Sequence, residues 1–320
     1  GQVRLHITAP PGTRLEETER WFSRVEARVR EAVPARDRTS ILDQIGMPGG
    51  YNLAITDSTN VSAADGEMLL TLSQHRTQRT ADVIRRLRQD LPQQFPELTF
   101  YFQPADVVTQ ILNFGLPSPI SVQVSGAKRD VTYAVAKELE ADLRRVRGAV
   151  DVHMHQVVAA LKFHIEVDRQ RSADVGLSER DVAQNLLLVI SSSSQVNPTF
   201  WTDSITGNSY PVAVQVPEYR VSSTDALSTL SFNSARGPQL LADLARMTRR
   251  TTPVFGSHTN VQPTYDVRAD IQDTDLGSVA KQVFALKAKY EKKLPRGAPI
   301  TVRGQVESMR EGFESLGLGL

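Results

Sequence analysis

Two histidines, His153 and His155, stand two residues apart in a segment that reads as a strand. Side chains two apart on a strand share a face, so both imidazole rings would point the same way. Imidazole binds zinc and related ions, but a zinc site needs three or four ligands. Asp151 has the same parity and could join the pair, whereas His164 lies on a neighbouring predicted strand of unknown register. Because this ligand set is incomplete, we expect polar residues on an exposed strand face and predict neither a metal site nor a cofactor.

Patterns that mark a catalytic centre are missing from the sequence. It has no nucleophile elbow, no paired-carboxylate motif and no HExxH motif. The acidic pairs at 16–17 and 138–140 fall on helix faces that should be solvated. Lysine and arginine number 37 against 36 acidic residues, a net charge of +1, which argues against nucleic acid as a partner. We predict that the chain is not an enzyme. Two alternatives stay open: a metal-dependent hydrolase built on His153 and His155, and a structural module without a ligand.

A glycine-rich loop runs from Gly46 to Gly66 between two predicted strands. Loops of this length are uncommon inside compact domains and are often functional. No Gly-Lys-Ser/Thr follows, so it is not a phosphate-binding loop. We predict a switch loop, because its glycines permit backbone motion and its larger side chains offer apolar contact. The residues concerned are Gly46, Met47, Gly49, Gly50, Tyr51 and Leu53.

Aromatic residues gather just before a proline-rich break at 117–119. Strand alternation places Phe100 and Phe102 on one face and Tyr101 on the other. Core packing beneath a helix accounts for the first two. Ligand sites favour domain interfaces, however, so we also expect Phe102 and Phe114 to line a cleft at this join.

Hydrophobic periodicity divides the first hundred residues into strand, helix, strand, strand, helix, strand. Val3, Leu5 and Ile7, for example, alternate with polar residues as in a half-buried strand. The predicted strands are 3–7, 40–45, 67–72 and 98–103, and the predicted helices are 15–32 and 80–91. This order is that of a split βαβ unit.

The same order returns after the break, but it is interrupted. Strands are predicted at 120–124, 150–158 and 161–167, with a helix at 131–143. The second helix appears only at 276–294, between predicted strands at 265–271 and 300–303. Roughly ninety residues, nearly a domain by size, therefore interrupt the second unit. We expect 161–167 to pair in the sheet that contains 120–124, and 300–303 to lie beside them.

The insertion spans residues 176–262. Ser178 and Asp181 cap a short apolar helix that runs to Ile190, and the remainder is strand-like with frequent turn signals. The predicted fold class is α+β, with two ferredoxin-like split βαββαβ subdomains, the second interrupted by a mostly β subdomain.

Several segments, in order along nearly the whole chain, resemble the second large periplasmic loop of resistance-nodulation-division (RND) efflux transporters. They are Ala9 to Thr18, Phe163 to Asp168 with Ala173 to Ser178, Pro263 to Arg268 with Asp275 to Val279, and Arg303 to Gln305 with Glu311 to Ser315. Their order along the chain makes the resemblance more specific than any one of them.

The resemblance implies the periplasmic part of an inner-membrane protein in the Gram-negative cell envelope. It implies porter subdomains at 1–117 and at 118–175 with 263–304, a docking subdomain at 176–262, and a connection to the membrane domain at 305–320. The intact protein would be a homotrimeric, proton-driven exporter that meets a periplasmic adaptor protein and an outer-membrane channel. Both ends of the sequence are expected to continue into that larger protein.

The cargo and its pathway are also implied by the resemblance. In RND transporters the glycine-rich loop separates two drug pockets, and the strand of His153 borders the cleft through which substrates enter. The loop residues named above, with Phe102, Phe114 and His153, would then line the substrate pathway. Heavy-metal members bind soft ions through clustered methionines, whereas those here are scattered at Met47, Met68, Met154, Met247 and Met309. We therefore predict hydrophobic or amphiphilic cargo, with a heavy-metal exporter as the alternative.

Overall fold

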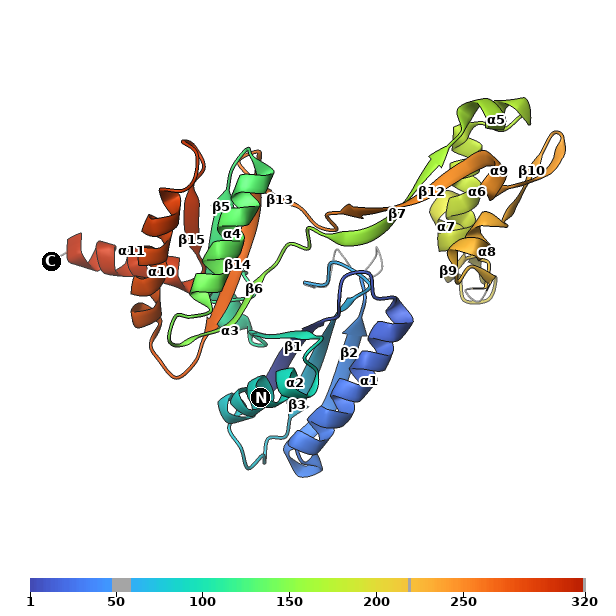
Figure 1. Cartoon of the computed structure of the whole chain (residues 1–320). Helices are drawn as coiled ribbons and strands as arrows, with labels where there is room; N and C mark the ends of the chain where they lie inside the picture. Colours follow the sequence, from blue (N-terminus) through green and yellow to red (C-terminus); the bar gives the residue numbers. More distant parts are fainter. Residues whose placement is uncertain (48–58, 218–219, 319–320) are drawn as a thin grey trace. The chain divides into compact units, whose positions relative to one another are not determined.

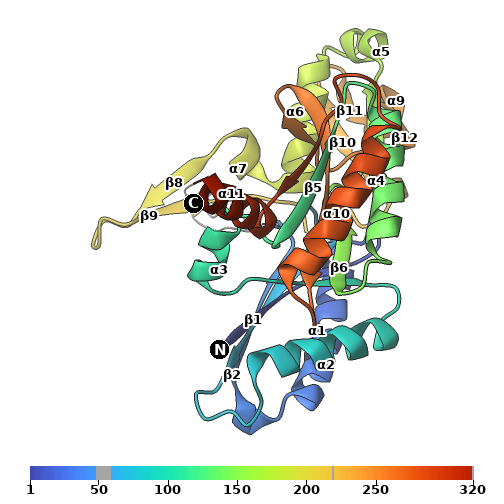
Figure 2. The ribbon, with the colours of Figure 1, turned by 90° about the vertical axis from the view of Figure 1, so that its left-hand side faces the viewer.

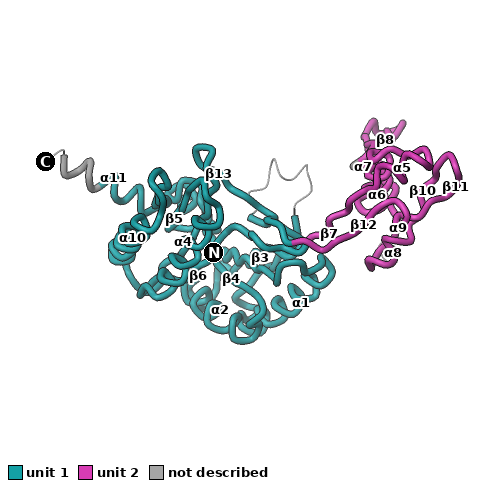
Figure 3. The backbone as a smooth tube through the Cα atoms, turned by 45° about the horizontal axis from the view of Figure 1, so that its top comes forward, with its two compact units in different colours: residues 1–161, 251–320 teal, residues 162–250 magenta. Residues whose placement is uncertain are grey.

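The structure is a computed structural model that describes residues 1–47, 59–217 and 220–318. It divides into two compact units (Figure 3). Residues 1–161 with 251–320 form the first unit, and residues 162–250 form the second. Within the described ranges, no helix is both long and apolar enough to cross a membrane.

The first half of the first unit is a four-stranded antiparallel sheet with two helices on one face (Figure 1). The strand order is β2-β3-β1-β4, formed by β1 (Gln2–Thr8), β2 (Arg38–Ile45), β3 (Asp65–Leu72) and β4 (Thr99–Gln103). The helices are α1 (Leu15–Ala32) and α2 (Thr80–Gln94), with a short 3₁₀ turn, η1 (Ala35–Asp37), after α1. Their apolar stripes meet the sheet in one core that includes Phe22, Leu70 and Leu87. This confirms the predicted ferredoxin-like order.

The second half of the first unit repeats that order with different strands. Its sheet runs β6-β14-β5-β15 and is built from β5 (Ile120–Ser125), β6 (Ala149–Met154), β14 (Gln262–Ile271) and β15 (Ile300–Arg303). A short strand, β13 (Ser257–Thr259), also pairs with β14. Helices α4 (Arg129–Leu143) and α10 (Leu276–Glu291) lie side by side over this sheet (Figure 2). Between the two halves lies α3 (Val107–Leu112), and α11 (Gln305–Leu318) follows β15.

One predicted strand pairing is wrong. Strand β7 (Ala160–Val167) does not join the sheet of β5, but pairs with β12 (Ala245–Thr252) in a separate two-stranded ribbon. These two strands carry the chain into the insertion and back, so they run antiparallel beside each other and satisfy each other's backbone groups. Leu161 is 67% exposed and Phe163 44% exposed, whereas Ile165 and Val167, farther along β7, pack against the core of the second unit. The prediction for 300–303 is confirmed, because β15 pairs with β5.

The second unit has a small core of its own around α6 (Glu179–Ser191). The core residues are Leu177, Val182, Leu186, Phe232, Leu241 and Leu244. The predicted cap is confirmed: Ser178 and Asp181 form a capping box at the start of α6. The remaining elements are short: α5 (Arg169–Asp174), α7 (Ser193–Val196), β8 (Thr199–Thr202), β9 (Ser209–Val212), α8 (Thr224–Ser228), β10 (Ser231–Ser234), β11 (Gly237–Leu240) and α9 (Leu241–Leu244).

Buried polar contacts join the two halves of the first unit where the edge strands β4 and β6 approach each other. The carboxylate of Asp151 accepts hydrogen bonds from Arg88 Nε at 2.8 Å and Nη2 at 2.6 Å, and from the backbone N–H of Phe102 at 3.0 Å. Arg88 also donates to Gln272 and Asp270. The Asp151 carboxylate therefore accepts a hydrogen bond from an N–H on the edge of β4 that would otherwise be open to pairing with a further strand. For this reason the two sheets do not merge.

Candidate functional site

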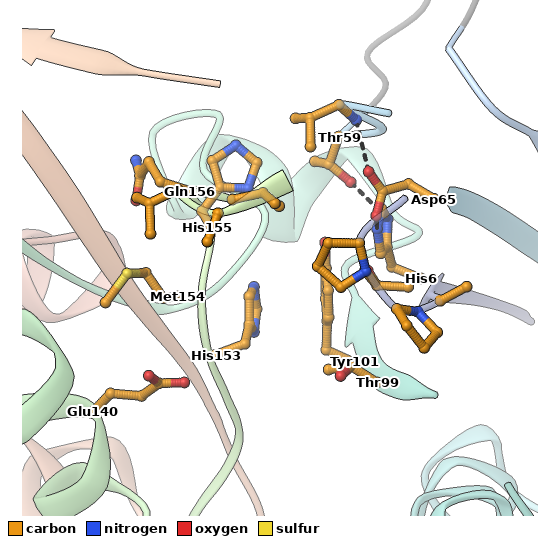
Figure 4. Close-up of a pocket in the computed structure, with 18 of the residues that line it drawn as sticks. His6, Thr59, Asp65, Thr99, Tyr101, Glu140, His153, Met154, His155 and Gln156 are labelled. Carbon is orange, nitrogen blue, oxygen red and sulfur yellow. Dashed lines mark hydrogen bonds and ion pairs between the residues drawn. The ribbon is translucent and has the colours of Figure 1, made fainter. Parts of the chain in front are cut away.

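A pocket of 490 Å³ lies where β1, β4 and β6 come together in the first unit (Figure 4). Three aromatic rings stack along it. His6 lies directly opposite Tyr101 across the β1–β4 ladder, and their ring centroids are 4.4 Å apart. His153, on β6, stacks on the Tyr101 ring at 3.7 Å with an interplanar angle of 13°. Tyr101 thus separates two histidines that come from different halves of the unit.

On the first side of the stack, His6 is surrounded by polar partners. Its Nδ1 lies 3.0 Å from the hydroxyl of Thr59 and 3.8 Å from Glu67, and its Nε2 lies 3.6 Å from Asp65. Burial alone would raise the pKa of Glu67. The contact with His6 and the charge of Arg4, 2.8 Å away, overcome this effect and lower the pKa to about 2. Glu67 is therefore ionised at neutral pH, and the His6 side of the stack is a closed network.

On the second side, His153 has only one of its ring nitrogens satisfied. Its Nδ1 is 2.7 Å from the backbone carbonyl oxygen of Asp151. A carbonyl can only accept, so Nδ1 carries the hydrogen and Nε2 carries a lone pair. Within the described part of the chain, that Nε2 is buried and has no hydrogen-bond partner. Burial first, and then the charge of Arg268, lower the pKa of His153 to about 3, so the ring is neutral at pH 7.

His155 lines the same pocket and is neutral for the same reasons. Burial, followed by the charge of Arg268, lowers its pKa to about 2. Its ring meets Phe255 edge-on, with centroids 5.1 Å apart. The next residue, Gln156, is held by Asp266, whose carboxylate accepts from Gln156 Nε2 at 2.6 Å and whose backbone N–H donates to Gln156 Oε1 at 2.7 Å. Strand β6 and the residue that follows it therefore hold two uncharged imidazoles on a backbone that Asp266 fixes.

This arrangement suits binding rather than catalysis. At pH 7 these imidazoles are not protonated to imidazolium, because their pKa values are about 3 and about 2, so they are poor general acids. Among the residues that the structure describes, no three histidine, cysteine or acidic side chains are placed to hold a metal ion together. Glu140, near His153 in Figure 4, is occupied by Lys137 and Arg144 at 2.9 and 2.7 Å. At this pocket, the lone pair on His153 Nε2 is covered and has no hydrogen-bond partner among the described residues.

The structure brings only His153 of the predicted pathway residues into this pocket. The expectation of an exposed strand face was wrong for His153, which is 8% exposed, because β4 and Tyr101 cover it. Phe102 packs in the first core, as alternation predicted, and also lines a separate pocket of 980 Å³ together with Pro117 and Pro119 of the predicted join. Tyr101 faces the stack. Phe114 is 61% exposed and has a left-handed φ of 56°.

The predicted switch loop is described only at its ends. Gly46 is buried and has φ 77°, which favours glycine, and the side chain of Met47 is exposed. Gly49, Gly50, Tyr51 and Leu53 lie outside the described residues.

The sequence analysis did not identify His6 and Tyr101 as pocket residues, nor Arg268 as a neighbour of the pocket. The parity of β1 does place His6 away from Val3, Leu5 and Ile7, and that of β4 places Tyr101 away from Phe102. That signal shows that these side chains share the face opposite the helices. It does not show that His153, from the other half of the unit, stacks on Tyr101 at that face.

Comparison with known proteins agrees with this architecture. Residues 1–318 match the sequence profile of the AcrB/AcrD/AcrF family. The chain belongs to this family. Membership confirms the predicted RND resemblance, and the chain is a periplasmic part of an inner-membrane efflux protein.

Proteins that are similar to the chain in sequence are considerably longer than it is. Protein HelA of Legionella pneumophila is 25% identical over 325 residues, which cover 99% of the chain and 30% of HelA. Cation efflux system protein CusA of Escherichia coli (strain K12) is 28% identical over 211 residues, or 65% of the chain and 19% of CusA. A crystal structure of a heavy metal efflux pump matches with a TM-score of 0.79 at 21% identity, over 99% of the chain and 32% of the pump. That likeness shows the fold, and the chain spans less than a third of each of these proteins.

Proposed function

We propose that the chain is the substrate-handling and docking portion of a proton-driven RND efflux pump whose cargo is a metal cation. The observation that carries this proposal is the pair of neutral histidines, His153 and His155, in the 490 Å³ pocket. Imidazole lone pairs bind transition metals, and Asp65 adds a carboxylate to the pocket wall. Relatives named for cation efflux and heavy metal efflux support the same cargo.

The hydrophobic or amphiphilic cargo predicted first has less support. The described pocket wall includes histidines, carboxylates and cationic side chains, which a purely hydrophobic ligand would leave without partners. A site with few fixed ligands also fits transport, because an exporter must bind its cargo weakly enough to release it.

The partners and the division into subdomains are proposed with the function. Residues 1–117 would form one porter subdomain, and 118–175 with 263–304 the other. Residues 176–262 would dock, and 305–320 would lead to the membrane domain. Exposed aromatic residues on the β8–β9 hairpin, Phe200 at 53% and Trp201 at 57%, support a docking role for the insertion. The partners would be a periplasmic adaptor, an outer-membrane channel and two further copies of the transporter.

Export by the intact transporter tests this proposal. In a strain that lacks its own metal and drug exporters, expression should lower cellular Zn²⁺, Co²⁺ or Cu²⁺, measured by mass spectrometry, and should raise resistance to that ion. Protection against hydrophobic dyes, with no change in any cell-associated metal, would replace the cation cargo by an amphiphilic one.

A further inference from the structure

His153 Nε2 is one of several buried side-chain atoms that have no hydrogen-bond partner among the described residues, and of the residues concerned only His153 lines the 490 Å³ pocket. Buried polar atoms in proteins are nearly always hydrogen-bonded, because leaving one unsatisfied forfeits its interaction with water. His153 is 8% exposed, and its Nε2 has no partner among the described residues. Its Nδ1–H is fixed on the Asp151 carbonyl, so rotation of the ring to satisfy Nε2 would break that bond.

This geometry is the one that metal-binding histidines adopt. Such a histidine donates its other ring N–H to a carbonyl or a carboxylate, which sets the tautomer and orients the ring toward the ion. The Asp151 carbonyl fills this supporting role at 2.7 Å. The face-to-face contact with Tyr101 holds the plane of the ring (Figure 4).

From these contacts we propose that His153, through Nε2, and His155 form a binding site for a borderline divalent transition-metal ion such as Zn²⁺, Co²⁺ or Ni²⁺. Water would complete the coordination sphere. The inference rests on the proposed cation cargo and assigns it a site and a chemical class.

The donor types select this class of ion. Nitrogen ligands suit Zn²⁺, Co²⁺ and Ni²⁺, whereas Cu⁺ and Ag⁺ prefer thiolate and thioether sulfur. The chain has no cysteine. Met154 contributes the only methionine side chain in the described wall of the pocket. One thioether beside two imidazoles favours a borderline ion over a soft one.

The surrounding charges would keep the affinity moderate. Arg268 lies opposite His153 in the β14–β6 ladder, and Arg144 lines the pocket, so both oppose a cation. Asp65, Glu67 and Glu140 provide negative charge on the other side of the balance. Because Nε2 is covered as well as unpartnered, an ion reaches it only when the pocket wall moves. Loading and release would therefore follow opening of the pocket.

The test is titration of the 320-residue chain with Co²⁺, followed by its visible absorption, and competition with Zn²⁺ and with Ag⁺. The variants are His153→Phe, which keeps a ring against Tyr101, and His155→Phe. The matched control is His164→Phe, because His164 is exposed on β7 outside the pocket. We expect each pocket variant to weaken Co²⁺ binding at least about tenfold, since even loss of a supporting partner costs that much. The control should leave binding unchanged.

The outcomes separate the site from the function. Co²⁺ binding that both pocket variants retain, or preference for Ag⁺ over Co²⁺ and Zn²⁺, would overturn the inference while leaving cation export intact. Absence of Co²⁺ and Zn²⁺ binding by the chain would do the same if the intact transporter still lowers cellular metal. Conversely, binding lost in His153→Phe, together with an intact transporter that exports no cation, would uphold the site and overturn the proposed function.

Discussion

His6 and His153 lie on opposite faces of one tyrosine ring, yet their polar atoms are satisfied very differently. His6 contacts Thr59, Asp65 and Glu67 within 3.8 Å. His153 has a single partner, on Nδ1, and none is found for Nε2 among the described residues. Equal burial therefore does not mean equal roles. A satisfied network stabilises the fold, whereas an orphaned lone pair at a pocket can bind a ligand once the wall that covers it moves.

The largest effect is expected from a variant that breaks the contact of β6 with β4, which holds His153 against Tyr101. Arg88→Gln would leave the buried Asp151 carboxylate without its cation. We expect the free energy of unfolding to fall by about 3 kcal/mol in urea denaturation at pH 7, as for other broken buried ion pairs. Arg79→Gln is the matched control, because the Arg79–Asp82 pair is exposed and should contribute little to the free energy of unfolding. If the two variants lost equal free energies of unfolding, Arg88 would not be what holds β6 against β4.

The next prediction compares the loss of stability when each of the two histidines is replaced by phenylalanine. His6→Phe would deprive the buried Asp65 and Glu67 of a partner and should cost about 2 kcal/mol of unfolding free energy. His153→Phe removes one hydrogen bond but also an unsatisfied nitrogen, so it should cost about 1 kcal/mol or less. Urea denaturation of both variants checks this. Were His153→Phe the more damaging, Nε2 would have a structural partner and the comparison would fail.

Asp43 on β2 tests whether an orphaned buried atom alone marks a binding site. Its Oδ1 is buried without a partner in the described chain, but Asp43 does not line the pocket. Burial first, and then the charge of Glu26, raise its pKa to about 6. A raised folded-state pKa gives stability that is complete below the unfolded pKa of 3.8 and is lost as pH rises through 6.

Asp43→Asn should therefore stabilise the chain above pH 6, by about 1 kcal/mol once partial exposure is allowed for. The gain should vanish below pH 4, and Co²⁺ binding should not change. Thermal denaturation at pH 4 and pH 8 measures the first effect. A stabilisation independent of pH would show that burial of the charged form is not its cause.

The sequence predicted much of the fold because each half of the first unit follows a simple period. Val3, Leu5 and Ile7 alternate as β1 requires, and the aliphatic residues of α4 repeat every three to four positions. Strand β7 was misassigned because alternation shows that a segment is extended, not which strand it pairs with. Its true partner, β12, lies about eighty residues away and is chosen by the path of the chain through the insertion.

The candidate site was only partly predictable. The two-residue spacing alone predicted that His153 and His155 lie on the same face of a strand. Alternation along the strand placed Tyr101 and Phe102 on opposite faces. The burial of His153 depends on contact between the two halves of the first unit, which no local pattern encodes. The hydrogen bond of Nδ1 to the Asp151 carbonyl depends on backbone geometry, since Asp151 has a left-handed φ of 53°. The first cargo prediction weighed the scattered methionines and did not use the buried lone pair of His153.

Anomalous diffraction from crystals of the chain soaked in Zn²⁺ tests the central claim most directly. Data at the zinc absorption edge would locate the bound ion without reference to any variant. The account predicts an anomalous peak about 2.0–2.1 Å from His153 Nε2, the usual zinc–nitrogen distance, and within coordinating reach of His155. A peak only at the exposed histidines, or a pocket in which His153 Nε2 is hydrogen-bonded to an ordered water in the presence of excess Zn²⁺, would contradict it.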